Sequence, residues 1–361
     1  MALDTQTVAG LSTIDPTIWK RIAVRAPNWV GDAVMALPFF AALHRLAADA
    51  DIVCLCKANV AALYRDVSTV DRVIELDQSR GPSGGAFARA NARQLRREAL
   101  DAAFCLPTSF GSALMLWLAR VPRRYGHAAE GRGVLLSKSL PYRPNGRRPH
   151  RTDGYLTLLG LVFPDAERSE KLEYRPGERA VLETDRLWTE HEIGERGPVL
   201  AIAPSAAQPN KMWMSDRFAS IAVRWHEQTK GAVILLGGPA DRPTCEQVRD
   251  HSGEYALNLA GHGDLTVAGE LIRRAAVFVG NDSGLAHLAA AVGTRTVVIS
   301  GPGDPAEVAP YSPLAHTIKH PLFCSPCYKN TCWRKDKPLE CLTEVSVDTV
   351  WQHVEQFRAT R

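Results

Sequence analysis

The feature that most constrains the fold is a repeated alternation of short apolar runs, rich in β-branched residues, with helical segments. In the first half, strand patterns cover 21–26, 51–56, 72–76 and 101–106, with helical patterns at 33–48, 58–65 and 86–100. In the second half, strand patterns cover 199–203, 232–236, 275–279 and 295–300, with helical patterns at 215–228, 242–250, 266–274 and 286–292. This spacing predicts an α/β protein whose parallel sheets are covered on both faces.

A segment rich in Pro, Arg and Gly, 142–179, separates the two series, and 361 residues suffice for two domains. We therefore predict two Rossmann-like, doubly wound domains, 1–175 and 176–361, which face each other across a central cleft. A last helix is predicted at 347–359 and packs on one half or the other.

The run 280–287 (GNDSGLAH) lies between a predicted strand and an alanine-rich helix. A tight loop at that junction points backbone N–H groups at an anion, and the helix N-terminus adds partial positive charge. Ligands of open α/β sheets bind at the carboxyl ends of the strands. We expect an anion site here, and the alternative is that Asp282 and Ser283 only cap the helix.

A second polar loop, 27–32 (PNWVGD), follows the first predicted strand. A carboxylate at this turn faces the predicted cleft, where Asp32 can accept a proton from an attacking hydroxyl. The alternative is again a helix-capping aspartate.

Two loops of the second half border the same cleft. Ser205, in the small-residue run after the first strand, precedes Lys211, whose ammonium suits a diphosphate. Taken alone, Lys211 is better explained as a surface lysine in a loop. Gly238 allows close approach of a ligand, and Asp241 is placed to take ribose hydroxyls. Neither loop carries the Walker A or the G-x-G-x-x-G pattern, which argues against a nicotinamide enzyme.

Composition excludes several classes. The hydrophobic share of 45% and the charged share of 23% are those of a globular protein, and the net charge of +4 does not indicate nucleic acid. The segment 120–151 nevertheless holds nine Lys or Arg against one acid, which indicates either a polyanionic partner or a solvated loop. Residues 1–16 show no signal-peptide pattern, and no apolar run is long enough to span a membrane. We therefore expect a cytoplasmic protein, and peripheral contact with the inner membrane is compatible with both observations.

Four cysteines lie within 18 residues: Cys324, Cys327, Cys332 and Cys341. This spacing fits a tetrahedral metal site, but it fits reduced thiols or disulfides as well, and the alternatives stay open.

Taken together, the motifs resemble those of the ADP-heptose:lipopolysaccharide heptosyltransferases, inverting glycosyltransferases of family 9 with a GT-B fold. The likeness runs from Arg21 to about Val350 and rests on 26–32 (APNWVGD), 106–114 (LPTSFGSAL), 211–213 (KMW) and 281–287 (NDSGLAH). The tryptophan before VGD and the LPTSF segment favour the branch that adds the second heptose. Ser205 departs from the glycine that is usual in the family.

The resemblance implies roles for these residues. Asp32 is expected to be the general base, and Lys211 to bind the diphosphate and stabilise the leaving ADP. The expected donor contacts are Ser205, Lys211, Gly238, Asp241, Asp282, Ser283, Gly284, Leu285 and His287. The expected acceptor contacts are Asn28, Thr108, Ser109, Arg123 and Arg124. No metal or other cofactor is expected to be required, since ADP-heptose is the co-substrate.

Two other functions fit the same residues. One is a protein heptosyltransferase that modifies autotransporters, or another family 9 core glycosyltransferase. The other is a sugar-nucleotide-binding module without catalysis, against which the joint presence of Asp32, Lys211 and Asp282 argues.

Overall fold

The computed structural model describes residues 16–79, 81, 84–143, 148–167, 171–195, 197–253 and 255–359. Residues 1–15, on which most of the signal-peptide argument rests, and Arg147 of the basic segment lie outside this part of the chain.

The first half forms a six-stranded parallel sheet in the order β3-β2-β1-β4-β5-β6. Its strands are β1 (Arg21–Arg25), β2 (Asp51–Cys56), β3 (Arg72–Glu75), β4 (Ala102–Cys105), β5 (Arg123–Ala128) and β6 (Lys138–Pro141). Its helices are α1 (Val30–Met35), α2 (Leu37–Leu46), α3 (Ala58–Arg65), α4 (Gly84–Leu95), α5 (Phe110–Leu118) and α6 (Arg151–Thr157). The helical pattern at 33–48 is divided between α1 and α2 because Pro38 occupies the first turn of α2, where its missing N–H costs nothing.

The second half forms another six-stranded parallel sheet, in the order β12-β11-β10-β7-β8-β9. Its strands are β7 (Leu200–Ala203), β8 (Val233–Leu235), β9 (Ala256–Asn258), β10 (Val277–Asn281), β11 (Arg295–Ser300) and β12 (Ala315–Lys319). Its helices are α7 (Glu178–Glu190), α8 (Ser215–Thr229), α9 (Arg242–His251), α10 (Leu265–Arg274), α11 (Gly284–Ala291), α12 (Pro305–Val308), α13 (Glu340–Thr343) and α14 (Val347–Ala359).

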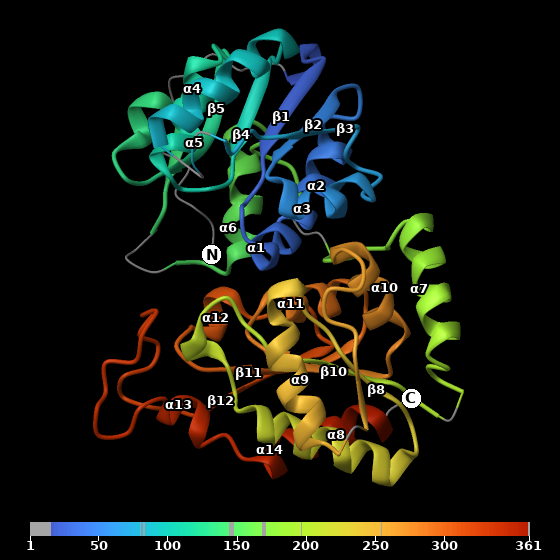
Figure 1. The fold of residues 1–361 in the computed structure, drawn as a ribbon. Coiled ribbons are helices and arrows are strands. Elements are labelled where there is room, and N and C mark those ends of the chain that lie inside the picture. Colours follow the sequence, from blue (N-terminus) through green and yellow to red (C-terminus); the bar gives the residue numbers. More distant parts are fainter. Residues whose placement is uncertain are drawn as a thin grey trace.

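The two sheets have the same doubly wound order once the strands of each half are counted from its own first strand. The strand order reverses between β1 and β4 in one sheet and between β7 and β10 in the other. Ligands of such sheets bind beside this reversal, at the carboxyl ends of the strands. Figure 1 shows the halves stacked one above the other, with α1 and α11 between them.

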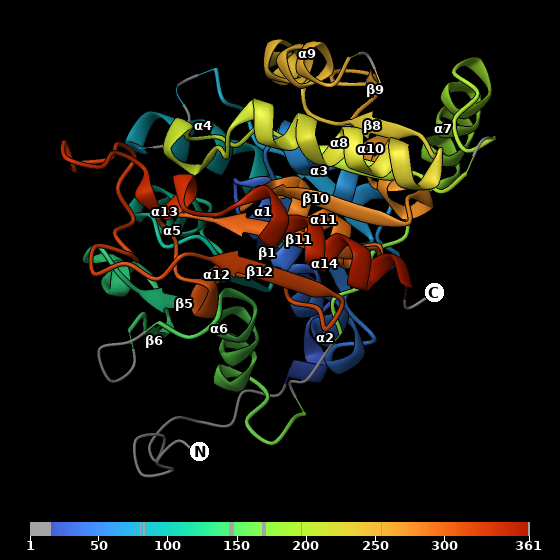
Figure 2. The ribbon, with the colours of Figure 1, turned by 90° about the horizontal axis from the view of Figure 1, so that it is seen from below.

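The last helix, α14, packs against the second half; the sequence alone did not show on which half it packs. Figure 2 shows α14 beside β11 and α8, and its buried residues Val350, Trp351 and Val354 join the core around those elements. The chain end therefore stabilises the second sheet.

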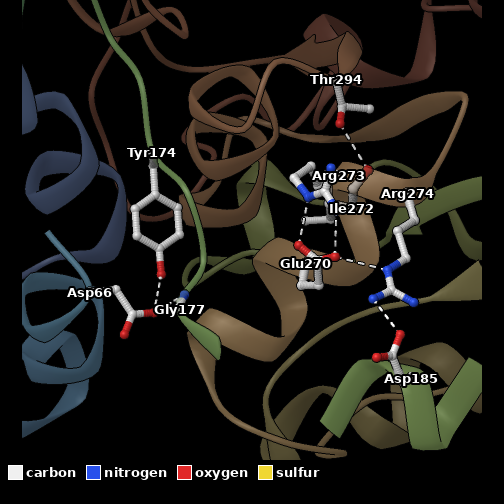
Figure 3. A network of polar contacts seen from close by, with 9 residues as sticks. All are labelled: Asp66, Tyr174, Gly177, Asp185, Glu270, Ile272, Arg273, Arg274 and Thr294. Atoms are coloured by element: carbon white, nitrogen blue, oxygen red, sulfur yellow. Dashed lines mark hydrogen bonds and ion pairs between the residues drawn. The ribbon is translucent and has the colours of Figure 1, made fainter. Parts of the chain in front are cut away.

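The segment 171–177 links the halves and is held by both. The backbone N–H of Tyr174 donates to Ala291 of the second half at 2.8 Å, while its hydroxyl donates to Asp66 of the first half at 2.9 Å. Asp66 also accepts the N–H of Gly177 (Figure 3). The predicted boundary between residues 175 and 176 falls in this segment.

Close to the linker, α10 is tied to α7 through a buried carboxylate. Glu270 accepts from Arg273 and Arg274, and Arg274 also forms an ion pair with Asp185 of α7 at 2.7 Å (Figure 3). The arrangement fixes α7, the first helix after the linker, on the second half.

Candidate active site

Two cavities meet in the cleft between the halves. One, of about 330 Å³, lies mainly against the first half, and the other, of about 890 Å³, lies mainly against the second. Trp29, Asp32 and Arg151 line both cavities. Two ligands, one in each cavity, would therefore meet at Asp32.

Asp32 is the third residue of α1 and does not cap it. Trp29 is the N-cap residue and the helix has no side-chain cap, whereas Asp32 Oδ1 lies 3.3 Å from Nε of Arg151. Burial raises the pKa of Asp32, and the charge of Asp282 adds to this, while the charges of Arg151 and Lys211 oppose it. A carboxylate with a raised pKa is suited to accept a proton at the edge of a ligand cavity.

Lys211 and Asp282 form an ion pair in the larger cavity, which Asp32 also lines. Lys211 Nζ donates to Asp282 Oδ2 at 2.8 Å, and the Asp282 side chain is 8% exposed. His287 Nε2 lies 3.9 Å from the other oxygen of Asp282, and burial lowers the pKa of His287 to about 4. The imidazole is thus neutral at pH 7, and the Lys211 ammonium faces the large cavity.

Buried Asn281 holds the loop that carries Lys211. Its side chain accepts the N–H of Trp213 at 2.9 Å and donates to the carbonyl of Pro204 at 2.7 Å. Both ends of the 204–213 loop are thus fixed to the end of β10. Asn281 belongs to a motif recognised in the sequence, but its hydrogen bonds to the 204–213 loop were not predicted.

The glycines of the two motifs allow the halves to touch. A Cβ atom at Gly31 would lie 2.7 Å from Cδ2 of His287, and one at Gly284 would lie 2.6 Å from Cβ of Val30. Glycine is therefore required at both positions for the contact of α1 with α11. The space beside the Cα atom of Gly284 is therefore occupied by Val30.

All nine residues predicted to bind the donor line the large cavity: Ser205, Lys211, Gly238, Asp241, Asp282, Ser283, Gly284, Leu285 and His287. The hydroxyl of Ser205 is buried and has no hydrogen-bond partner among the described residues. The carboxylate of Asp241 accepts the N–H of Gly238 at 2.8 Å, so it also shapes its own loop. Ser283 occupies the N-cap position of α11 but makes no side-chain cap bond, and the Asp282 side chain accepts from Lys211, so side-chain capping does not account for these two residues.

Three of the five predicted acceptor residues line the smaller cavity: Asn28, Thr108 and Ser109. Two fully buried arginines form hydrogen bonds to the loops that carry these three residues. Arg25 donates to the side-chain oxygen of Asn28, and Arg132 donates to the carbonyls of Pro107 and Ser109. Neither arginine pairs with a carboxylate in the described ranges, so both leave net positive charge beside the cavity.

The structure does not bring Arg123 and Arg124 to either cavity. They begin β5, which runs parallel to β4, and so they lie at the edge of the sheet opposite the cleft. Arg123 lies 5.8 Å above the ring of Trp19, and Arg124 donates to the carbonyl of Leu135 at 2.6 Å. The prediction that these two residues contact the acceptor is corrected accordingly.

Other arginines of the basic segment take their place. Arg148 and Arg151 line the smaller cavity, and both contact Tyr142. Arg148 lies 5.3 Å above the Tyr142 ring, and Arg151 Nη1 donates to its hydroxyl at 3.0 Å. Glu307 of the second half closes the cavity, 3.7 Å from Arg148. The charge count of 120–151 therefore identified the segment that lines the smaller cavity, but not which of its arginines do so.

The four clustered cysteines lie outside both cavities. All four are free thiols that line a separate cavity of about 30 Å³. The tail that carries them is tied to the Lys211 loop, because Asn210 donates to the carbonyl of Lys329. Within the described part of the chain, no group of three or more His, Cys, Asp or Glu side chains is arranged to hold a metal ion, so the metal alternative gains no support.

Comparison with known proteins agrees with this architecture. Residues 88–337 match the model of glycosyltransferase family 9 (heptosyltransferase). Lipooligosaccharide heptosyltransferase 2 of Haemophilus influenzae is 30% identical over 316 residues, which cover 82% of this chain and 88% of that protein.

Solved structures share the fold. ADP-heptose lipopolysaccharide heptosyltransferase II of Escherichia coli superposes with a TM-score of 0.77 and 23% identity, covering 94% of this chain and 99% of that one. A family 9 glycosyltransferase of Veillonella parvula superposes with a TM-score of 0.84 and 19% identity, covering 98% and 100%. Both likenesses concern the two-domain GT-B fold.

The chain belongs to glycosyltransferase family 9, and it is a glycosyltransferase with a GT-B fold. No helix in the described ranges is long and apolar enough to cross a membrane.

Proposed function

We propose that this protein is an inverting heptosyltransferase that adds the second heptose to the inner core of lipopolysaccharide. It transfers L-glycero-D-manno-heptose from ADP-heptose to heptosyl-Kdo2-lipid A. The observation that carries the proposal is the position of Asp32, where the two cavities meet, together with the Lys211–Asp282 pair that lines the larger of them. Relatives named lipooligosaccharide or lipopolysaccharide heptosyltransferase 2 support the transfer of a heptose to lipopolysaccharide.

The reaction is a single displacement. Asp32 removes the proton of the acceptor hydroxyl, whose oxygen attacks the anomeric carbon of the heptose. The bond between that carbon and the diphosphate oxygen breaks, and the configuration inverts. Lys211 and the N–H groups at the start of α11 neutralise the charge that develops on ADP. Asp282 holds Lys211 in place and contacts the donor heptose.

The acceptor enters the smaller cavity as an anion. Arg148 and Arg151 line this cavity, and buried Arg25 and Arg132 add positive charge behind its loops, against Asp32 and Glu307. This excess of positive charge favours the carboxylates and phosphates of an inner core over a neutral glycan.

The experiment that tests the function is a transfer assay with ADP-heptose and lipopolysaccharide cores truncated before and after the first heptose. We expect turnover only on the core that already carries one heptose, seen as a mass increase of one heptose. Turnover on the heptose-free core would contradict the second-heptose assignment. Transfer to a polypeptide and to neither core would favour the protein heptosyltransferase instead.

We also propose that the protein works on the cytoplasmic face of the inner membrane, which it contacts through a face built on α4 and α5. Trp117 is 48% exposed there and borders a groove with Arg96 and Arg120. Arg89 and Arg93 of α4, and Arg97 just after it, are exposed as well. An exposed tryptophan among arginines suits the headgroup layer of an anionic bilayer.

Vesicle sedimentation tests this contact. We expect binding to vesicles that contain anionic lipid, and release at high salt. The variant Trp117→Ser/Arg96→Glu/Arg120→Glu should bind at least about tenfold more weakly, since each basic residue near such a surface contributes about 1 kcal/mol. The matched control, Leu182→Ser/Arg186→Glu on exposed α7, should bind like the wild type. Equal binding of the triple variant and the wild type would refute this contact.

A further inference from the structure

Arg151, the first residue of α6, lies between the two cavities in direct contact with Asp32. Its Nε atom is 3.3 Å from Asp32 Oδ1, and it is the only cation within ion-pair distance of Asp32 in the described ranges. The Nε atom is buried, and among the described residues it has no hydrogen-bond partner with good geometry. Its contact with the Asp32 carboxylate is therefore an ion pair at 3.3 Å without an aligned hydrogen bond.

The guanidinium has a rigid support. Tyr142 accepts a hydrogen bond from Nη1 of Arg151 at 3.0 Å, and its ring packs edge-on against His127 at 5.9 Å between centroids. His127 in turn contacts the carbonyl of Gly154 in α6 at 2.8 Å through Nε2. This series of contacts, from Gly154 of α6 through His127 and Tyr142 to Arg151, fixes the position of the guanidinium.

The other charged and titratable groups around Asp32 have partners of their own. Lys211 from the 204–213 loop is paired with Asp282 from β10, and His287 from α11 lies beside Asp282. Tyr155 from α6 is buried and un-ionised at neutral pH, since burial keeps its pKa above the ordinary value. Arg151 is thus the group available to orient Asp32.

We propose that Arg151 is the positioning residue of the base: it holds one carboxylate oxygen of Asp32 and leaves the other for the acceptor hydroxyl. This inference rests on the proposed role of Asp32. Burial raises the pKa of Asp32, and the charge of Arg151 is the largest influence that lowers it. Loss of that charge raises the Asp32 pKa further, so the base would be protonated, and inactive, up to a higher pH.

The test is the pH dependence of kcat/KM for transfer from ADP-heptose to the heptosylated core. Wild-type kcat/KM should rise with pH as Asp32 loses its proton. In Arg151→Met this rise should move about one to three pH units higher, the range an opposite charge within ion-pair distance produces. Arg151→Lys should lie between the two, because an ammonium keeps the charge without the Nε geometry. ADP affinity should stay near the wild-type value in both variants.

The controls separate this inference from the proposed function. Arg186→Met removes an arginine from exposed α7 and should leave the profile unchanged. If Arg151→Met is active with the wild-type rise, or only raises the acceptor KM, Arg151 does not position the base. If Arg151→Met does not fold, the same criterion applies to Arg151→Lys. If the wild type shows no rise, or Asp32→Asn keeps full activity, the assignment of Asp32 itself fails.

Discussion

Replacement of Asp32 by asparagine should lower kcat for heptosyl transfer by about 10²- to 10⁴-fold, the usual contribution of a general base. The amide is nearly the same size as the carboxylate but does not accept the proton of the acceptor hydroxyl. ADP affinity should remain near wild type, because Lys211 and the start of α11 are unchanged. Initial rates of ADP release and calorimetric titration with ADP measure the two effects.

The matched control is Asp216→Asn, which removes another first-turn aspartate, in α8, away from both cavities. A first-turn carboxylate favours its helix through the macrodipole, so Asp216→Asn should lose a small amount of stability. Asp32→Asn also removes the cost of burying the charge, which is what raises the pKa of Asp32, so it should lose no more stability than Asp216→Asn. Only Asp32→Asn should lose activity. Equal activity of the two variants would show that Asp32 acts as a helix-terminal charge and not as a base.

Replacement of Lys211 by methionine should lower kcat by about 10²- to 10³-fold, the effect expected from loss of one group that stabilises developing charge. It also leaves Asp282, with its 8% exposed side chain, without the cation that faces it at 2.8 Å. A negative charge beside the diphosphate then opposes binding, so ADP affinity should fall as well. Steady-state rates and ADP titration distinguish this variant from Asp32→Asn, which should retain ADP affinity.

Lys337→Met is the control, because it removes a lysine that pairs with Glu340 at 3.0 Å outside both cavities. It should keep wild-type rates and ADP affinity. Lys211→Arg should recover part of the lost activity, since it keeps the charge in a different shape. Unchanged ADP affinity in Lys211→Met would contradict the contact between Lys211 and the diphosphate.

The inner strands other than β5, and most helices, could be predicted because they bury apolar residues on a regular period. The predicted ranges for β2, α3 and α14 match the observed ones. These elements either lie inside the sheet, where both faces are covered, or present one apolar face to the core.

Edge strands β6, β9 and β12, the inner strand β5 and helix α7 were not predicted, since they lack that pattern. β6 and β12 are edge strands with alternating or polar residues, and β9 has three residues. β5 begins with two arginines and contains a glycine. Helix α7 buries only Ala180, Thr184 and Leu187, too narrow a stripe among charged residues to stand out.

The site residues that could be predicted from the sequence are those in loops that directly follow a strand. The loops after β1, β4, β7 and β10 each carried a recognisable motif, and these four strands flank the two points where the strand order reverses. Arg151, Tyr142 and Glu307 were not predicted, because they reach the cavity from separate segments that share no local pattern. Arg123 and Arg124 were misplaced because a charge count does not say at which end of a strand a residue lies.

The most direct test of this account is a crystal structure of the protein with an unreactive ADP-heptose analogue and the heptosylated core oligosaccharide. We predict the diphosphate beside Lys211 in the cavity of about 890 Å³ and the oligosaccharide in the cavity of about 330 Å³. The attacking hydroxyl should lie within hydrogen-bond distance of Asp32, about 2.6 to 3.2 Å, and face the anomeric carbon. An oligosaccharide bound away from Asp32, or a diphosphate remote from Lys211, would contradict the account.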